Sequence, residues 1–333
     1  MNQNSNPNPA FPPLEPPRLF PTLISGFNLV ARKAYLLLLP IALDLLFWFG
    51  PHVKIDRLMA ASIKEMLSTP LPAGADAKMF SDIMLSFQDF VSRFNLLTQL
   101  SNRPVGVPSL MALIFPIRNP FGIPVSFEVT NWGQATSGIL LFGLLGLVLT
   151  SLYIGMVARA TATPAEAVSV QRAIWEFLQI LGMSLLAIVL VFILSIPAIL
   201  IAWVLFMINQ TMASIVISLG AFLLLWLLIP FVFAPHGIYA AGQNAFHSIL
   251  ISGRLVRALY PGVTLFLLAI LLISEAMNWL WTGAPDTSWL MAACVFGNAF
   301  FSTALIAASF IYYRRAAAWV ARPQRITRPP TNF

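Results

Sequence analysis

The sequence predicts an all-α, polytopic membrane protein. Its six transmembrane helices would form three hairpins, with amphipathic helices on the inner membrane surface and a helical cap on the outer side. Hydrophobic residues make up 59% of the 333 residues, charged residues make up only 9%, and the mean hydropathy is +0.83. One soluble core of this size cannot bury so much apolar surface. The chain also contains six long apolar runs, and its basic residues gather in alternate connections between them.

The six apolar runs are each close to the length of about 20 residues that a helix needs to cross a bilayer. They are residues 34–50, 136–158, 178–205, 214–234, 263–282 and 288–313. The first is short, but the preceding RLFPTLISGFNLVARK is amphipathic enough to lie in the membrane interface and lead into it. A seventh apolar segment, residues 104–125, is not counted because it contains five prolines and Arg118. Backbone that irregular cannot face lipid with its polar groups unsatisfied.

The basic residues favour one orientation of these spans. With the N-terminus inside, twelve Lys and Arg residues and three Glu residues fall on the inner side, whereas seven basic and seven acidic residues fall on the outer side. An excess of Lys and Arg in short inner connections is the usual pattern in membrane proteins. We therefore expect a multi-pass protein of the cell (plasma) membrane with both termini in the cytoplasm. The pI of 10.0 then reflects membrane orientation, and nucleic acid is not expected as a partner.

The chain divides into five parts on this topology. They are a disordered tail rich in Pro and Asn (1–20), an interfacial helix with the first span (21–50), an extracytoplasmic helical insertion (51–135), a five-span membrane domain (136–313) and a basic cytoplasmic tail (314–333). Two amphipathic helices are predicted in the insertion, near Ile55–Leu67 and Met79–Leu100. The insertion is either a cap packed on the outer ends of the spans or a docking surface for a protein partner or lipid, which the proline-rich loop 105–122 would help to form.

A short motif recurs before the spans. LISGFNLVARKAY at Leu23–Tyr35 is similar to LISGRLVRALY at Leu250–Tyr260, and SVQRAIWEFLQILG before the third span is a looser third copy. The repeated unit would be an amphipathic helix followed by a helical hairpin. We expect its basic residues to contact membrane lipids at the inner surface: Arg32, Lys33, Arg254 and Arg257. The alternative is an ordinary basic loop at each position.

This unit resembles the membrane domain found ahead of some glycerophosphodiester phosphodiesterases and in related uncharacterised six-span bacterial proteins. The likeness rests on AFHSILISGRLVRALY, with Ser252 and Arg254, leading into a span, and it covers mainly residues 136–313. The chain has no room for the catalytic phosphodiesterase domain, and it departs from the pattern by the large insertion between its first two spans. The resemblance therefore implies a membrane anchor or a sensor-like module and no hydrolase.

Two carboxylates lie inside predicted spans, and both fall in the outer half of the bilayer. Asp44 is in the first span and Glu275 in the fifth, with Asn298 and Ser195 at a similar depth. A helix-centre Asp costs about 2.5–3.5 kcal/mol to insert, so these side chains should face the bundle interior or water. Either they belong to a structural hydrogen-bonded layer, in which Asn298 is the partner of Glu275, or Asp44 and Glu275 bind a proton, a cation or a cationic solute.

Enzymatic chemistry finds little support in the sequence. The three histidines, His52, His236 and His247, lie in separate loops, and there is no phosphate-binding loop, dinucleotide motif or nucleophile elbow. We therefore expect no catalytic residue, no metal and no cofactor. The leading hypothesis is a non-enzymatic integral membrane module that organises or senses within the bilayer through lipid or protein contacts. The alternative is a small carrier or channel for a proton, cation or cationic solute that uses the outer-half acidic layer.

Overall fold

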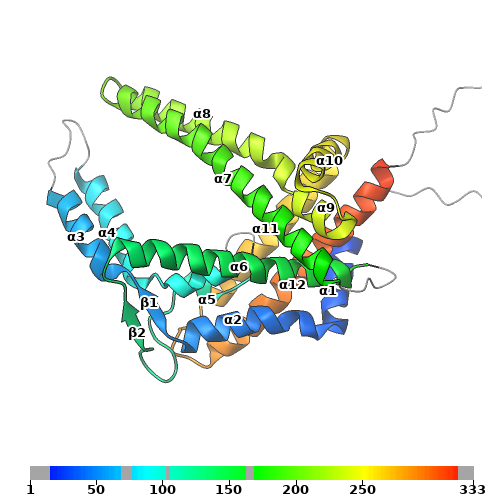
Figure 1. Cartoon of the computed structure of the whole chain (residues 1–333), viewed down its shortest axis with the longest axis horizontal. Helices are drawn as coiled ribbons and strands as arrows, with labels where there is room; N and C mark the ends of the chain where they lie inside the picture. The colour runs from blue at the N-terminus through cyan, green and yellow to red at the C-terminus, as the bar shows by residue number, and fades with distance from the viewer. Residues whose placement is uncertain (1–15, 69–76, 103–105, 163–168, 322–333) are drawn as a thin grey trace, which may run out of the picture.

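Long helices dominate the chain (Figure 1). The computed structural model describes residues 16–68, 77–102, 106–162 and 169–321. Five helices in this part are long and apolar enough to cross a membrane: α6 (Trp132–Ala160), α7 (Val170–Phe206), α8 (Gln210–Leu228) with its continuation to Ala241, α11 (Tyr260–Thr282) and α12 (Leu290–Val320). The first predicted span is a shorter apolar segment, the 3-10 turn η1 (Ala34–Leu37) followed by α2 (Leu38–Phe49). By the length and composition of its helices, the protein is helical and membrane-embedded.

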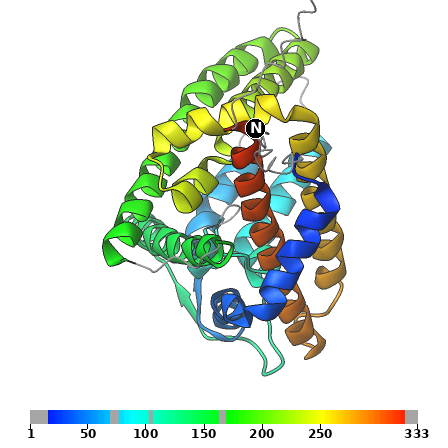
Figure 2. The ribbon, with the colours of Figure 1, turned by 90° about the vertical axis from the view of Figure 1, so that its right-hand side faces the viewer.

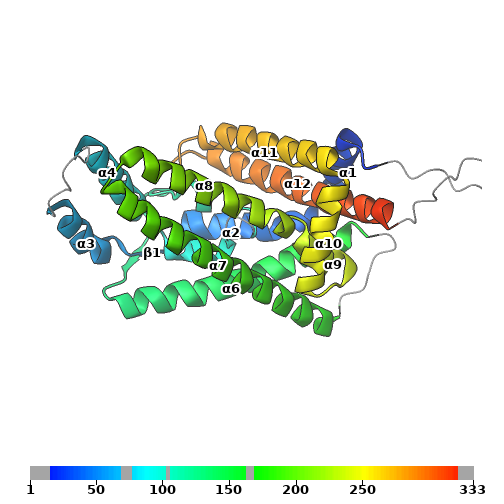
Figure 3. The same cartoon turned by 90° about the horizontal axis from the view of Figure 1, so that it is seen from above.

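The helices α2, α6, α11 and α12 run along the long axis of the molecule (Figure 1, Figure 3). One end of this bundle, the terminal end, carries α1 (Leu19–Arg32), α10 (Ala245–Ala258) and the last turns of α12. The other end, the cap end, carries α3 (Asp56–Ser68) and α4 (Ala77–Arg93). At the terminal end α10 lies crosswise over the bundle (Figure 2), whereas α1 packs against the side of α12.

Short polar residues and a proline set several helix boundaries. The side-chain oxygens of Asn131, Asn209 and Asn244 each accept a hydrogen bond from a backbone N–H in the first turn of α6, α8 and α10. These bonds satisfy amide groups that the helix itself leaves without a partner. Gly242, in the left-handed conformation with φ 63°, ends α9 (Ala234–Ala241). Pro261 begins α11, where a missing N–H costs nothing.

Two elements differ from the helices that the sequence patterns predict. The looser third copy of the motif, residues 169–182, lies almost entirely in the 37-residue α7 and is not a separate surface helix. The last helix continues to Val320, so Arg314 and Arg315 belong to α12 and not to a tail. Residues 1–15 and 322–333, which make up most of the two predicted tails, lie outside the described residues.

The predicted insertion forms a small helical unit at the cap end. α3 and α4 pack on each other and bury Ile63, Met84 and Val91. β1 (His52–Lys54) pairs in parallel with β2 (Ser126–Glu128), and this pairing joins the beginning of the insertion to its end. The 3-10 turn η2 (Leu96–Ser101) packs so closely on α6 that its backbone leaves no room for a Cβ at Gly146.

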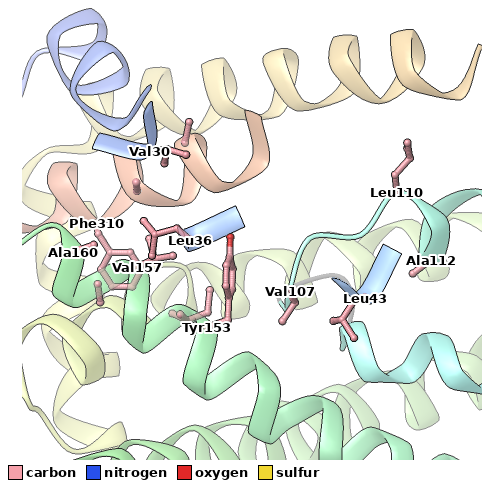
Figure 4. Close-up of a cluster of buried hydrophobic side chains, with 14 of the residues drawn as sticks. Val30, Leu36, Leu43, Val107, Leu110, Ala112, Tyr153, Val157, Ala160 and Phe310 are labelled. Carbon is pink, nitrogen blue, oxygen red and sulfur yellow. The ribbon is translucent and has the colours of Figure 1, made fainter. Parts of the chain in front are cut away.

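The proline-rich segment of the insertion enters the bundle. Residues 106–114, called the inserted loop, include the short helix α5 (Met111–Ile114). Val107, Leu110 and Met111 are buried in the main hydrophobic core, together with side chains of α2, α6, α9 and α12. Figure 4 shows Val107 and Leu110 in this cluster. The described part of the segment, residues 106–125, forms no spanning helix, as predicted. Because the inserted loop is largely core, this part of the segment offers no docking surface.

Charged side chains join α6 to α7 at the terminal end. Arg159 near the end of α6 and Arg172 near the start of α7 both form ion pairs with Glu176, each with an N–O distance of 3.0 Å. The side chains of Glu176 and Arg159 are only 1% and 8% exposed. Removing one partner of a buried pair leaves an uncompensated charge and costs about 3–5 kcal/mol. The network therefore holds the terminal ends of the two helices together.

Toward the cap end, α7 and α8 lean away from α6 (Figure 1, Figure 2). After Met183 the only buried residue of α7 is Ala202, and the only buried residue of α8 is Ala213. The two helices pack on each other and expose apolar side chains, among them Trp203 at 63%. The cap-end half of α6 also exposes apolar side chains such as Leu140. We call the region between the cap-end half of α6 and the α7–α8 pair the wedge.

Candidate functional site

Asp44 is buried in α2 and holds the inserted loop. Its carboxylate accepts hydrogen bonds from Ser109 Oγ at 2.5 Å, from the backbone N–H of Met111 at 2.9 Å and from that of Leu110 at 3.2 Å. The Ser109 hydroxyl oxygen in turn accepts from the N–H of Ala112 at 3.0 Å. The first turn of α5 would otherwise leave these N–H groups unsatisfied inside an apolar bundle. The carboxylate in the first predicted span therefore serves as a positioning residue for this loop.

The other predicted polar residues do not gather around Asp44. Glu275 is exposed on α11 and makes no hydrogen bond with any described residue. Asn298 is buried on α12, where its side-chain oxygen accepts a hydrogen bond from Ser302 Oγ at 3.4 Å. Ser195 is half-buried on α7, away from the pockets described below. The predicted hydrogen bond between Asn298 and Glu275 is therefore wrong, and the described residues form no acidic layer.

Two adjoining pockets lie inside the bundle. One, of about 340 Å³, is bounded by α11, α12 and the inserted loop. The other, of about 280 Å³, is bounded by α6, α7, α9 and α12. They share the lining residues Gly106, Val232, His236, Ile306 and Ser309, so we treat them as one site, the bundle pocket. Such volumes are those of sites for small molecules or for part of a lipid.

Neutral polar side chains line the part of the pocket between α11 and α12. Ser274 and Asn278 lie one turn apart on α11, and Asn298 and Ser302 lie one turn apart on α12. We call these four residues the amide layer. Within the described part of the chain, the side chains of Ser274 and Asn278 make no hydrogen bond, and Nδ2 of Asn298 donates none. Ser274 and Asn278 are half-buried and line the pocket, so water or a ligand there can form hydrogen bonds with the amide layer.

His236 lies where the two pockets meet. Its Nε2 is 2.8 Å from Ser309 Oγ, and Ser309 donates its hydroxyl proton to the carbonyl oxygen of Ile306 at 2.7 Å. Ser309 must therefore accept from His236, which places a ring proton on Nε2 and makes Nδ1 of the neutral ring an acceptor. Nδ1 has no hydrogen-bond partner among the described residues.

The residues that line the bundle pocket include no Asp, Glu, Lys or Arg in the described ranges. Ser109 lines it, but the carboxylate that Ser109 binds, that of Asp44, does not. The described His, Cys, Asp and Glu side chains also form no group that could hold a metal ion. The chemistry that this pocket offers is hydrogen bonding to an uncharged group in apolar surroundings.

The bundle pocket lies at the closed end of the wedge. Ile180, Met183 and Ser184 of α7 line it, and they mark the point beyond which α7 is no longer buried against the bundle. Leu147 and Thr150 of α6 line it from the opposite side. Apolar groups in the wedge are therefore next to the pocket.

Comparison of this chain with protein-family models, with curated proteins and with solved structures finds no match. The resemblance to the membrane domain of the phosphodiesterases thus remains a prediction.

The four predicted surface residues differ in their surroundings. Arg32 is exposed at the end of α1, and Arg254 and Arg257 are exposed on α10. Lys33 instead donates a hydrogen bond of 3.0 Å to the carbonyl oxygen of Ala160, the last residue of α6. Lys33 therefore links the beginning of η1 to α6.

The sequence pattern identified Asn298 but not the other members of the amide layer or the histidine beside them. These residues are Ser274, Asn278, Ser302 and His236. A signal for three of them exists in the sequence, because polar residues four apart in an apolar run lie on one helix face. No such spacing marks His236, whose position depends on how α9 packs against α12.

Proposed function

We propose that this protein is a non-enzymatic integral membrane module that binds a membrane lipid in the bundle pocket. In this proposal the acyl chains lie in the wedge, and the polar part of the lipid reaches the neutral polar side chains of the pocket. The observation that carries the proposal is the position of the pocket at the closed end of an apolar wedge. The exposed apolar side chains of α6, α7 and α8 are covered favourably by acyl chains and unfavourably by water.

The proposal includes six spans in the cell membrane, with the terminal end at the cytoplasmic surface and the cap end outside. The excess of Lys and Arg in the connections at the terminal end supports this orientation. Trp279 and Trp289, near the cap ends of α11 and α12, are 84% and 60% exposed, which is typical of side chains at a membrane–water interface. Arg254 and Arg257, exposed on the crosswise α10, would contact anionic headgroups at the opposite surface.

The hypothesis of a carrier or channel for a proton or cation has less support. A site for a cation inside a bundle needs a carboxylate that faces it. The carboxylate of Asp44 is directed to the inserted loop, and Glu275 is exposed on α11. Neither residue lines the bundle pocket.

Lipid retention tests the proposal. The variant Ser302→Phe places a large side chain in the bundle pocket, whereas Ser195→Phe makes the same change at a half-buried serine outside it. Each protein is purified in detergent, and the lipid that remains bound is measured per protein by mass spectrometry. We expect the wild type and Ser195→Phe to retain the same lipid and Ser302→Phe to lose most of it. Equal retention by all three proteins would contradict lipid binding in the pocket.

A further inference from the structure

We infer that the lipid held in the bundle pocket has an uncharged, hydroxyl-bearing polar group, of the kind that diacylglycerol carries, and that the amide layer selects it. This inference rests on the proposed function and names the class of ligand. Its basis is the combination of three properties of the amide layer: it has no charge, its hydrogen-bonding groups are unused, and it lies below the membrane surface.

The neutral side chains that line the pocket in the described ranges argue against a phosphate there. Ser274, Asn278, Asn298 and Ser302 are neutral, and no basic residue lines the pocket in the described part of the chain. A phosphate placed there would lose its hydration without gaining a positively charged partner, which is costly in apolar surroundings. Of the described basic side chains near α6, Arg159 forms an ion pair with Glu176, and Lys33 donates to the carbonyl oxygen of Ala160. An uncharged group avoids this cost.

The unused hydrogen-bonding groups match a hydroxyl and an ester. The amide of Asn278 has both a donor and an acceptor without a partner among the described residues, and Nδ2 of Asn298 is a further donor. A lipid hydroxyl both donates and accepts one hydrogen bond, and an ester carbonyl accepts one. Two asparagines from facing helices therefore supply the groups that such a headgroup requires. A purely apolar molecule would leave these amides unsatisfied.

The depth of the amide layer agrees with this class of lipid. Asn298 is eight residues beyond the cap end of α12, which corresponds to about 12 Å along a helix. Charged headgroups stay in the interfacial region outside the hydrocarbon core. A headgroup without charge can enter the core to this depth if its hydrogen bonds are satisfied there. The amide layer provides those bonds.

Photoreactive lipids with a common diazirine-bearing acyl chain test the inference. Diacylglycerol, phosphatidylcholine and phosphatidylglycerol probes are placed in nanodiscs with the full chain, and the labelled peptides are measured by mass spectrometry. We expect the diacylglycerol probe to label peptides from the bundle pocket at least about fivefold more than the phosphatidylglycerol probe, as one or more additional hydrogen bonds require. Asn298→Leu and Asn278→Leu should each remove this preference. Glu275→Leu, an exposed change on the same helix as Asn278, should leave it unchanged.

The possible outcomes separate the two proposals. Equal labelling of the pocket by all three probes would overturn the inference on lipid class and would agree with the proposed function. Labelling spread along the outside of α8, with none in the pocket, would overturn both. If the buried change Asn298→Leu prevents folding, Asn278→Leu decides the question, because its side chain is only half-buried. A diacylglycerol preference that persists in Asn278→Leu would contradict the amide layer as its cause.

Discussion

Among the described residues, one hydroxyl and two backbone N–H groups donate hydrogen bonds to the carboxylate of Asp44, and each of its oxygens accepts at least one of them. An asparagine at this position has only one acceptor oxygen. Whichever way its amide is turned, its NH₂ group meets a backbone N–H of Leu110 or Met111. We therefore expect Asp44→Asn to destabilise the protein by about 1–3 kcal/mol.

Thermal unfolding in detergent checks this expectation, with Glu275→Gln as the control because Glu275 is exposed. A melting temperature of Asp44→Asn equal to that of the wild type would show that the hydrogen bonds to the inserted loop do not stabilise the fold.

His52 provides a prediction of pH dependence at the cap end. Burial lowers the pKa of His52 below its ordinary value of 6.5, the hydrogen bond from Nε2 to the Phe47 carbonyl oxygen partly opposes this effect, and Lys54 lowers the pKa further. Protonation therefore favours the unfolded state. The free energy of unfolding is therefore highest above the unfolded pKa of 6.5, and it decreases as the pH falls through 6.5 toward the lower folded pKa.

We expect the melting temperature of the wild type to fall between about pH 7 and about pH 5 more steeply than that of His52→Gln, which cannot be protonated. The glutamine amide can still donate to the Phe47 carbonyl oxygen. Parallel curves for the two proteins would contradict a role of His52.

The sequence predicts the depth of a polar residue in the bilayer better than it predicts the hydrogen-bond partners of that residue. The predicted depth of Asp44 follows from counting residues along one span, but its partners lie in a proline-rich loop that no periodic pattern describes. Glu275 and Asn278 are less than one turn apart, yet one is exposed and the other lines the pocket. Which of them faces inward depends on the rotation of α11, which tertiary packing fixes.

At the scale of elements, the two copies of the ISG motif are used differently. Gly26 on α1 faces α12, where a Cβ would lie 2.5 Å from the carbonyl oxygen of Ala304 and 2.8 Å from the backbone nitrogen of Ala308. The corresponding Gly253 on α10 has ordinary space, with a Cβ 3.8 Å from Pro230. The first glycine thus permits a close helix crossing, and the second does not have this role.

We expect Gly26→Ala to destabilise the protein by about 1–3 kcal/mol through overpacking. Gly253→Ala should be neutral or stabilising by up to about 1 kcal/mol, since alanine is the better helix former. Thermal unfolding of the two variants in the same detergent makes this comparison. Equal destabilisation by both changes would contradict the different roles of the two glycines.

The exposed arginines of α10 give a second prediction at this scale. Replacing Arg254 and Arg257 together by Glu should weaken the contact of α10 with anionic headgroups by about 1 kcal/mol for each basic residue lost. Hydrogen exchange of residues 245–258 in anionic and neutral nanodiscs measures this contact. The wild type should be better protected in anionic nanodiscs, and the variant should not.

Replacement of Arg57 and Lys64 on α3 by Glu is the control, because these exposed residues lie at the opposite end of the molecule. Unchanged protection of α10 in the arginine variant in both bilayers would oppose a surface contact of this helix.

The existence of the helices could largely be predicted from hydrophobicity, whereas their extents could not. Five of the six apolar runs lie in helices long and apolar enough to cross a membrane, because length and composition decide this property. The pattern at residues 169–182 predicts a separate amphipathic helix, but α7 continues through Gly182 into the span, because an isolated glycine does not end a helix that is stabilised by packing. The inserted loop was recognised as irregular, but its burial depends on contacts with Asp44 that lie 65 residues away in sequence.

The whole molecule has one predicted orientation, and cysteine labelling in intact cells tests it. In a Cys294→Ser background, a membrane-impermeant thiol reagent should label Ser86→Cys on α4 and should not label Ser169→Cys or His247→Cys. All three positions are exposed, so access to the reagent depends on the side of the membrane. The excess of basic residues at the terminal end is the physical reason. Labelling of His247→Cys from outside would reverse the orientation.

Ion pairs join α7 to α6 at the terminal end, whereas the cap end of the α7–α8 pair leans away from α6. The tilt of this pair in the bilayer would therefore depend on membrane thickness. The apolar part of α7, residues 180–206, is about 40 Å long and exceeds a hydrocarbon core of about 30 Å, so the proposed membrane position requires this segment to tilt. In a thicker bilayer the same segment would need less tilt. Because the terminal end is fixed by the ion pairs of Glu176, this rotation moves the cap end of the pair toward α6. Bilayer thickness would thus control the width of the entrance to the pocket.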